Sequence, residues 1–139
     1  MSAKCFLDTN IFVYSFDAAN PTKAATARKL IQDRLRDRTA VISFQVVQEF
    51  FNVACKRFPA FVASPDAELY LAAVLRPMLT VHSSAGLYSE ALRLQQRYKL
   101  SWYDSIIVAA ASEAGCAVIY TEDLQDGAKL NGVLVKNPF

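Results

Sequence analysis

Two patterns of hydrophobic and polar residues alternate along the chain. The first is a short run of apolar residues, which is typical of a buried β-strand. It occurs at 4–7, 40–43, 79–82 and 117–121, with a further short run at 133–135. The first run ends at Asp8-Thr9-Asn10, a cluster of helix-capping residue types, and a helical stretch from Ile11 to Phe16 follows at once.

The second pattern spaces apolar residues three or four positions apart, as on one face of an α-helix. It predicts helices at 21–38, 44–58, 64–77, 87–98 and 101–114. Asn20-Pro21 and Ser64-Pro65 suit helix starts, and Gly115 suits the end of the last helix. Because strands alternate with helices throughout, the sequence predicts an α/β fold, a three-layer α/β/α sandwich on a mainly parallel sheet.

Length and composition indicate one compact domain. The 139 residues, 53% of them hydrophobic, fit a single domain over 1–139 with a substantial core. The longest uncharged run, Pro77 to Ser89, is shorter than the roughly 18 residues that a membrane helix needs. The N-terminus lacks the apolar core of a signal peptide, so we expect a cytoplasmic protein without a membrane partner.

Residue counts exclude several common chemistries. His82 is the one histidine, and Cys5, Cys55 and Cys116 lie among apolar residues without the spacing of metal ligands. We therefore expect buried, reduced thiols and no His-rich zinc site. The four glycines are too far apart for a P-loop or a dinucleotide fingerprint, which excludes those nucleotide-binding folds.

Four acidic residues fall at comparable places in the predicted fold. Asp8 follows the first strand, and Asp123 follows the fourth. Glu49 lies in the helix after the second strand, and Asp104 starts the helix that precedes the fourth. Ligands bind at the carboxyl ends of the strands in open α/β sheets, so we expect Asp8, Asp123 and Glu49 at that edge. Asp104 reaches the same edge only if its helix starts there.

Each carboxylate also has a structural explanation. Asp8 can cap the following helix, and Asp123 can cap a turn. Ser101-x-x-Asp104 is a capping-box pattern, and Glu49 falls on the polar face of its helix. The four together are harder to explain, because two charges ~4 Å apart repel by about 4 kcal/mol at an effective dielectric of 20. A bound cation removes that cost, and oxygen ligands without His or Cys favour Mg²⁺ or Mn²⁺.

Four blocks of residues, in order along nearly the whole chain, carry a resemblance to a known family. They are Asp8-Thr9-Asn10, Ser43-x-Gln45-x-x-x-Glu49, Leu100-Ser101-x-Tyr103-Asp104 and Thr121-Glu122-Asp123. Together they resemble the PIN-domain ribonucleases, in particular the VapC-type toxins of bacterial toxin-antitoxin pairs. The resemblance implies catalytic roles for Asp8, Glu49, Asp104 and Asp123, metal binding by Asp8, Asp104 and Asp123, and polar support from Asn10, Ser43 and Thr121. Glu122 offers a second carboxylate beside Asp123.

The function implied by this resemblance is metal-dependent hydrolysis of RNA phosphodiesters, by the endoribonuclease toxin of a type II toxin-antitoxin pair. The implied cofactor is Mg²⁺ or Mn²⁺, and the implied partners are RNA, a cognate antitoxin and a second copy of the chain. An antitoxin Arg or Lys that enters the acidic site would compete with the metal. The alternative is a catalytically inactive PIN-like module that binds RNA or protein.

Three further side-chain groups have two readings each. Trp102 and Tyr103 could stack on RNA bases, although core packing is the favoured interpretation. Acidic residues are interleaved with the basic residues between Arg28 and Arg38, and Lys29 can pair with Asp33 at helical spacing, which favours an ordinary solvated helix over a phosphate-binding surface. The last group has more apolar surface than the core is expected to cover, so we expect some of it to be buried against another chain. It consists of Phe44, Phe50, Phe51, Phe58 and Phe61.

Overall fold

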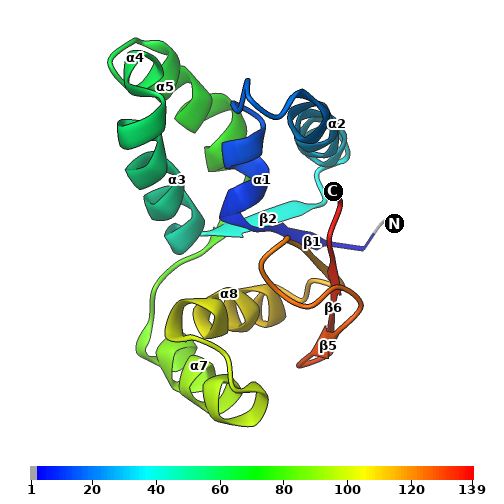
Figure 1. Cartoon of the computed structure of the whole chain (residues 1–139). Helices are drawn as coiled ribbons and strands as arrows, with labels where there is room; N and C mark the ends of the chain where they lie inside the picture. Colours follow the sequence, from blue (N-terminus) through cyan, green and yellow to red (C-terminus); the bar gives the residue numbers. More distant parts are fainter. Residues whose placement is uncertain (1–2) are drawn as a thin grey trace.

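A six-stranded sheet forms the centre of the computed structural model, which describes residues 3–139 (Figure 1). Its strands are β1 (Cys5–Leu7), β2 (Ala40–Ser43), β3 (Leu79–Val81), β4 (Val118–Tyr120), β5 (Lys129–Leu130) and β6 (Val133–Lys136). They lie in the order β3-β2-β1-β4-β6-β5. All neighbours are parallel except β5, which is antiparallel to β6.

Helices cover both faces of this sheet. They are α1 (Thr9–Tyr14), α2 (Pro21–Asp37), α3 (Phe44–Arg57), α4 (Pro59–Val62), α5 (Asp66–Tyr70), the π-helical turn η1 (Leu71–Leu75), α6 (Arg76–Met78), α7 (Ala85–Tyr98) and α8 (Trp102–Glu113). Helices α1 to α5 lie on one side of the sheet, and α7 and α8 lie on the other (Figure 1). The predicted three-layer α/β/α architecture is therefore confirmed. None of the helices within residues 3–139 is long and apolar enough to cross a membrane.

The register of the two central strands brings distant parts of the chain to one edge. Leu7 pairs with Tyr120, so the residues that follow them, Asp8 and Thr121, leave the sheet side by side. The backbone N–H of Asp8 donates to the carbonyl oxygen of Tyr120 at 3.1 Å, which continues the ladder by one bond. Parallel pairing thus places the ends of β1 and β4 at the same level.

The last helix is buried almost all round, and this fixes where it begins. Residues 105–111 of α8 are all buried, because the helix lies between the sheet and α7. Ser105 is fully buried, and its hydroxyl donates to the carbonyl oxygen of Ser101 at 2.7 Å. Gly115, with a φ of 72°, follows the helix and permits the left-handed turn that leads to β4.

Two predicted elements differ from the structure. The single helix expected at 64–77 is divided into α5, η1 and α6, and Pro77 lies inside α6 near its start. Pro59 was expected only to end a helix, but it also occupies the first turn of the short α4, where its missing N–H costs nothing. The strand β5 has two residues, too few for a hydrophobic period to reveal.

Two predictions about buried residues are wrong in part. Cys5 and Cys116 are buried free thiols, but Cys55 is exposed because it falls on the solvent side of α3. The phenylalanines at 44, 51, 58 and 61 are half-buried and Phe50 is fully buried, so none is left as an exposed apolar surface. Phe16 packs against this aromatic group, since its ring centroid lies 4.7 Å from that of Phe61 and 5.7 Å from that of Phe50.

Candidate active site

Asp8 lies at the end of β1 and is held through both of its carboxylate oxygens. Oδ1 accepts the backbone N–H of Thr9 at 2.7 Å, which makes Asp8 the N-cap of α1. Oδ2 accepts the hydroxyl of Thr121 at 2.8 Å. The capping role anticipated for Asp8 is therefore confirmed, and it coexists with a second bond to the end of β4. The side chain is 5% exposed.

Thr121 and Asn10 connect Asp8 to Asp123. The amide nitrogen of Asn10 donates to Thr121 Oγ1 and to Asp123 Oδ2, both at 3.1 Å. The backbone N–H of Asp123 donates to the same Thr121 oxygen at 3.1 Å. The first and last of the four sequence blocks thus form one hydrogen-bonded unit.

Glu49 is positioned by a glutamine one helical turn before it. Gln45 Nε2 donates to Glu49 Oε1 at 2.5 Å and to the carbonyl oxygen of Tyr103 at 3.2 Å. Gln45 is 4% exposed, so it does not lie on the solvent-facing side of α3. The contact with Tyr103 explains the burial, because the start of α8 covers this end of α3. The i, i+4 spacing of Gln45 and Glu49 is the sequence signal for this role.

Asp104 lies in the first turn of α8, half-buried, and Ser101 caps the helix as its sequence pattern predicts. The Ser101 hydroxyl accepts the backbone N–H of Asp104 at 3.2 Å. No hydrogen bond within residues 3–139 uses the carboxylate of Asp104 itself. The capping motif therefore explains the helix start but leaves this carboxylate available for a ligand.

The pKa of Asp8 is the most strongly displaced of the site. Burial raises it from an ordinary value to about 7, and the hydrogen bonds from Thr121 and Thr9 counteract this in part. The negative charges of Asp123 and Glu49 raise this pKa further. Near neutral pH the Asp8 carboxyl is therefore close to its pKa in the absence of metal.

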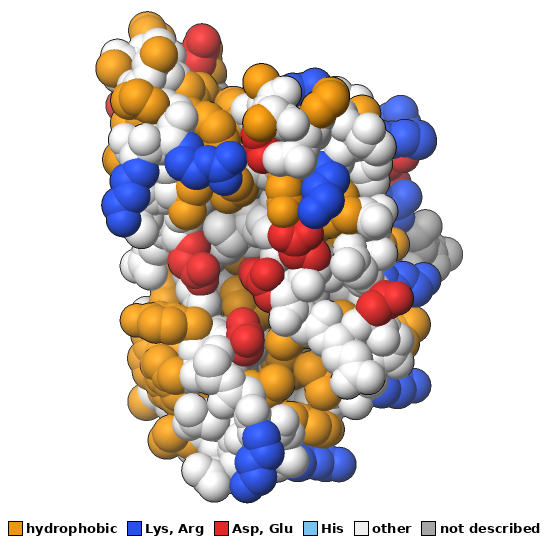
Figure 2. Space-filling model, in the orientation of Figure 1, with side chains coloured by type: hydrophobic (Ala, Val, Ile, Leu, Met, Phe, Trp, Pro, Cys, Tyr) orange, Lys and Arg blue, Asp and Glu red, His pale blue; other side chains and the backbone are white. Residues whose placement is uncertain are grey.

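The other carboxylates repel one another in the same way. Burial raises the pKa of Glu49, the hydrogen bond from Gln45 lowers it, and the charges of Asp104 and Asp123 raise it. The pKa of Asp104 is raised by burial and by Asp123 and lowered by Ser101. The four carboxylates predicted to share one edge therefore act on one another electrostatically. Figure 2 shows acidic side chains gathered in the middle of one face, between basic and apolar ones.

These carboxylates do not form a closed set of metal ligands. Within residues 3–139 no three His, Cys, Asp or Glu side chains lie close enough to hold one ion as they stand. Three of the four are instead held by protein donors: Asp8 by Thr121, Glu49 by Gln45 and Asp123 by Asn10.

The donor atoms nevertheless suit a hard divalent cation. All four acidic groups offer oxygen, and the buried oxygens without a hydrogen-bond partner in the described chain include Thr9 Oγ1, Asn10 Oδ1 and Ser43 Oγ. Ser43 ends β2 and is fully buried, but no hydrogen bond in the described chain joins it to the acidic groups. Oxygen donors beside mutually repelling carboxylates fit Mg²⁺ or Mn²⁺ better than zinc.

Glu122 is held by other partners than Asp123, although both line the same pocket. Its Oε1 accepts the hydroxyl of Tyr14 at 2.6 Å, and its Oε2 forms an ion pair with Lys23 at 3.2 Å. The Lys23 ammonium also lies 4.6 Å from the centre of the Tyr14 ring. Of the two adjacent carboxylates, Asp123 is therefore the one joined to the Asp8 unit.

The two aromatic residues before Asp104 differ in exposure. Trp102 is partly buried against the core, as its favoured interpretation predicts, and its ring centroid lies 6.1 Å from that of Tyr88. Tyr103 is 67% exposed, so core packing does not explain its ring.

The structure is an α/β domain with acidic residues gathered at the carboxyl edge of its sheet. The family profile of the PIN domain matches residues 5–125, and the chain belongs to the PIN-domain family. No curated protein matches the sequence.

Several solved structures have the same fold. One is a toxin-antitoxin complex from Klebsiella pneumoniae, with a TM-score of 0.68, 21% identity and 98% coverage of both chains. VapBC2 from Rickettsia felis, bound to a DNA fragment from its promoter, gives a TM-score of 0.69 at 16% identity over 96% of this chain and 97% of that one. VapC20 from Mycobacterium tuberculosis, a toxin that cleaves the sarcin-ricin loop, gives a TM-score of 0.59 at 20% identity over 86% of this chain and 90% of that one. These neighbours are VapC toxins and toxin-antitoxin complexes, as the sequence resemblance predicted.

Proposed function

We propose that this protein is a metal-dependent endoribonuclease of the VapC type, and that it acts as the toxin of a toxin-antitoxin pair. The observation that carries the proposal is the convergence of Asp8, Glu49, Asp104 and Asp123 from four separate segments onto one edge of a PIN-domain sheet. The toxin and antitoxin structures with the same fold support it.

In this mechanism Asp8, Asp104 and Asp123 would hold Mg²⁺ or Mn²⁺. Such an ion lowers the pKa of water and stabilises negative charge on a phosphoryl group. Thr121 fixes the direction of the Asp8 carboxylate, and Asn10 fixes that of Asp123. The mutual repulsion of the carboxylates, seen in their raised pKa values, would favour binding of such a cation.

Glu49 serves as the base that orients a water molecule and accepts its proton. Its raised pKa makes it a better proton acceptor than an exposed carboxylate. Gln45 donates to one oxygen of Glu49, which leaves the other oxygen for water. The reaction breaks a P–O bond of RNA and transfers the oxygen of water to phosphorus.

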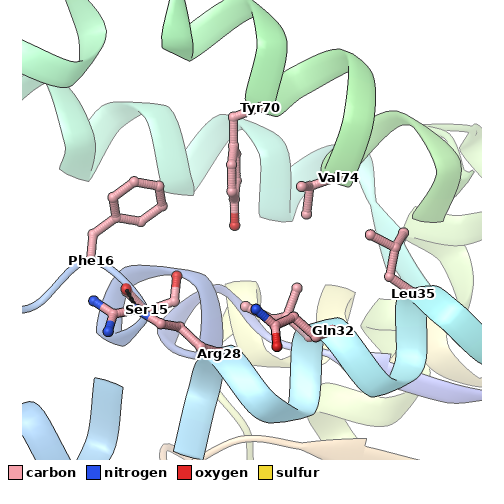
Figure 3. Close-up of a pocket in the computed structure, with 8 residues that line it drawn as sticks. Ser15, Phe16, Arg28, Gln32, Leu35, Tyr70 and Val74 are labelled. Atoms are coloured by element: carbon pink, nitrogen blue, oxygen red, sulfur yellow. Dashed lines mark hydrogen bonds between the residues drawn. The ribbon is translucent and has the colours of Figure 1, made fainter. Parts of the chain in front are cut away.

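The partners proposed for the protein are an antitoxin and a second copy of the chain. A pocket of about 380 Å³ lies between α2 and the α5–η1 segment, and Figure 3 shows Tyr70 and Val74 facing Gln32 and Leu35 across it. Its lining is mostly apolar, which suits an antitoxin segment that lays an apolar face into a groove. Phe16 lines this pocket, and the adjoining Asp17 lines the pocket of the acidic site, so one segment can reach both.

A separate surface suits the second copy. We call it the aromatic patch and define it as Tyr88, Leu92, Trp102 and Tyr103. Leu92 is 54% exposed and Tyr103 67%, and Tyr88 lies one helical turn before Leu92. A two-fold dimer needs one such self-complementary surface, and this one adjoins Asp104. Dimerisation there places the two acidic sites near the interface.

The test is cleavage of total RNA by the purified protein, with fragment ends mapped to single nucleotides. We expect cleavage with Mg²⁺ or Mn²⁺, none with EDTA, and at least a hundredfold loss in Asp8→Asn (roughly 3 kcal/mol of lost transition-state stabilisation). Asp66→Asn is the matched control, because Asp66 is an exposed carboxylate far from the site in sequence and in the fold. RNA binding without cleavage by the wild type would contradict the proposal and indicate the inactive binding module.

A further inference from the structure

The acidic site continues into a groove between α1 and α3. This pocket has a volume of about 470 Å³ and contains Asn10, Glu49 and Asp123 at its acidic end. One wall of the groove is formed by α3, through Glu49, Val53 and Arg57. These residues are four positions apart and therefore lie on one face of the helix. The groove therefore runs from the carboxylates past Val53 to a guanidinium group.

The opposite wall repeats this order of chemistry. Asn10, Val13 and Asp17, from α1 and the turn after it, line the same pocket. Polar groups thus face each other at the acidic end, two valines lie in the middle, and the ion pair of Asp17 and Arg57 closes the far end. Along α3 the distance from Glu49 to Arg57 is eight residues, or roughly 12 Å of helix.

Asp17 holds Arg57 in place but leaves some of its N–H donors available to a ligand. Its guanidinium lies 3.3 Å from Asp17 Oδ2, and its side chain is 48% exposed while that of Asp17 is 6% exposed. Asp17 is satisfied by other donors as well, since it accepts the Asn20 amide at 2.8 Å and the Ala19 N–H at 3.1 Å. A guanidinium has five N–H donors, so several remain for a ligand in the groove.

The other cations near the site are engaged elsewhere. Lys23 forms an ion pair with Glu122 and lies over the Tyr14 ring. Lys29 pairs with Asp33, as its helical spacing predicts. Arg36 also pairs with Asp33, and Arg34 pairs with Asp37. Arg57 is the one basic residue that lines this pocket in the described part of the chain.

We propose that Arg57, fixed by Asp17, binds a backbone phosphate of the RNA next to the phosphate that is cleaved. This inference rests on the proposed nuclease function. In the proposed reaction the scissile phosphate would lie at the carboxylates, and the separation of Glu49 and Arg57 by roughly 12 Å of helix favours a neighbouring phosphate for Arg57. A guanidinium pairs well with phosphate, and the two valines between give an apolar surface for the intervening sugar or base. The groove thus sets the direction in which the strand crosses the site.

The experiment compares two adjacent positions of α3 that carry the same charge. Arg57→Gln removes the cation that lines the groove, and Lys56→Gln removes a cation that does not. RNA binding is measured in the Glu49→Gln background, where cleavage is disabled, by fluorescence anisotropy with a labelled unstructured RNA and Mn²⁺ over a range of KCl concentrations. Steady-state cleavage by the single variants complements it.

We expect Arg57→Gln to weaken binding about tenfold or more and to reduce the slope of log K against log salt by about 0.7, the value for one phosphate contact on a single strand. In cleavage it raises KM with little change in kcat, and Arg57→Lys recovers part of the loss. Lys56→Gln retains the salt slope. Thermal melting of each variant separates loss of the Asp17 ion pair from loss of binding.

Two results distinguish failure of the phosphate site from failure of the nuclease function. If the wild type cleaves RNA and Arg57→Gln matches Lys56→Gln in affinity, KM and salt slope, the phosphate site at Arg57 is overturned while the nuclease function stands. If the wild type neither binds nor cleaves RNA with any divalent cation, both the function and the phosphate site are overturned.

Discussion

The hydroxyl of Thr121 donates a 2.8 Å hydrogen bond to Asp8, across 113 residues of sequence. The bond joins the residues that leave two adjacent parallel strands, and the same oxygen accepts from Asn10 and from the Asp123 backbone. Thr121 therefore fixes the carboxylate at the end of β1 relative to the carboxylate after β4. Its hydrogen bond also lowers the pKa of Asp8 and so favours the charged form.

Replacement of Thr121 tests this arrangement. In Thr121→Val the pKa of Asp8 rises further because a donor is lost, so we expect cleavage at neutral pH to fall and its pH midpoint to move upward. The Asn10 amide and the Asp123 backbone N–H lose the Thr121 oxygen as an acceptor, which should lower the free energy of unfolding by about 1 to 3 kcal/mol. The pH profile and a denaturant titration measure the two effects. Thr121→Ser keeps the hydroxyl and should restore both, whereas a midpoint unchanged in the valine variant would argue against this role.

The raised pKa of Asp8 predicts how stability depends on pH without metal. Between about pH 4 and 7 the folded state retains a proton that the unfolded state has lost, so stability falls as pH rises through this window. A shift of this size corresponds to about 2 to 4 kcal/mol. Asp8→Asn should remove most of the fall, and Mg²⁺ should stabilise the wild type more at pH 8 than at pH 5. If the stabilities of the wild type and Asp8→Asn depend on pH in the same way in EDTA, the prediction is refuted.

The two adjacent carboxylates after β4 should differ in importance. Glu122 is paired with Tyr14 and Lys23, so Glu122→Gln should retain most of the metal-dependent cleavage. Asp123→Asn should lose at least a hundredfold (roughly 3 kcal/mol), because Asp123 belongs to the unit that contains Asp8. Initial rates at saturating Mg²⁺ compare them. Greater loss in Glu122→Gln than in Asp123→Asn would reverse the assignment.

The aromatic patch predicts a dimer. Light scattering at tens of micromolar should give about twice the chain mass of 15.4 kDa for the wild type. Leu92→Glu should give a monomer, since it places a charge on the patch. Leu69→Glu should not, although Leu69 is also exposed, at 63%, because it lies on α5. A monomeric wild type, or dissociation caused by Leu69→Glu alone, would count against this surface.

The positions of the four carboxylates could be predicted because they follow from strand ends. The short apolar runs locate the ends of β1 and β4, and a parallel sheet brings such ends to one edge. Ser101 and the apolar run after it likewise locate the start of α8, and with it Asp104. Backbone periodicity therefore predicts where Asp8 and Asp123 leave the sheet and where the helix of Asp104 begins.

The directions of individual side chains could not be predicted, because they depend on contacts between distant segments. Glu122 is held by other partners than Asp123 because Tyr14 and Lys23 lie beside it. Gln45 is buried because the carbonyl of Tyr103 faces it from another helix. Hydrophobic periodicity carries no information on either contact. The Asp17 and Arg57 pair was missed for the same reason, although the spacing of Glu49, Val53 and Arg57 along one helix face is visible in the sequence.

Mn²⁺ binding, followed by electron paramagnetic resonance at pH 8, tests whether the acidic cluster is a single divalent-cation site. Asp104→Asn and Asp66→Asn form a matched pair, because both remove a carboxylate from the first turn of a helix. We predict that the wild type and Asp66→Asn bind Mn²⁺ alike and that Asp104→Asn binds at least tenfold more weakly (about 1.4 kcal/mol). No Mn²⁺ bound by the wild type, or equal affinity in all three proteins, would contradict the metal site.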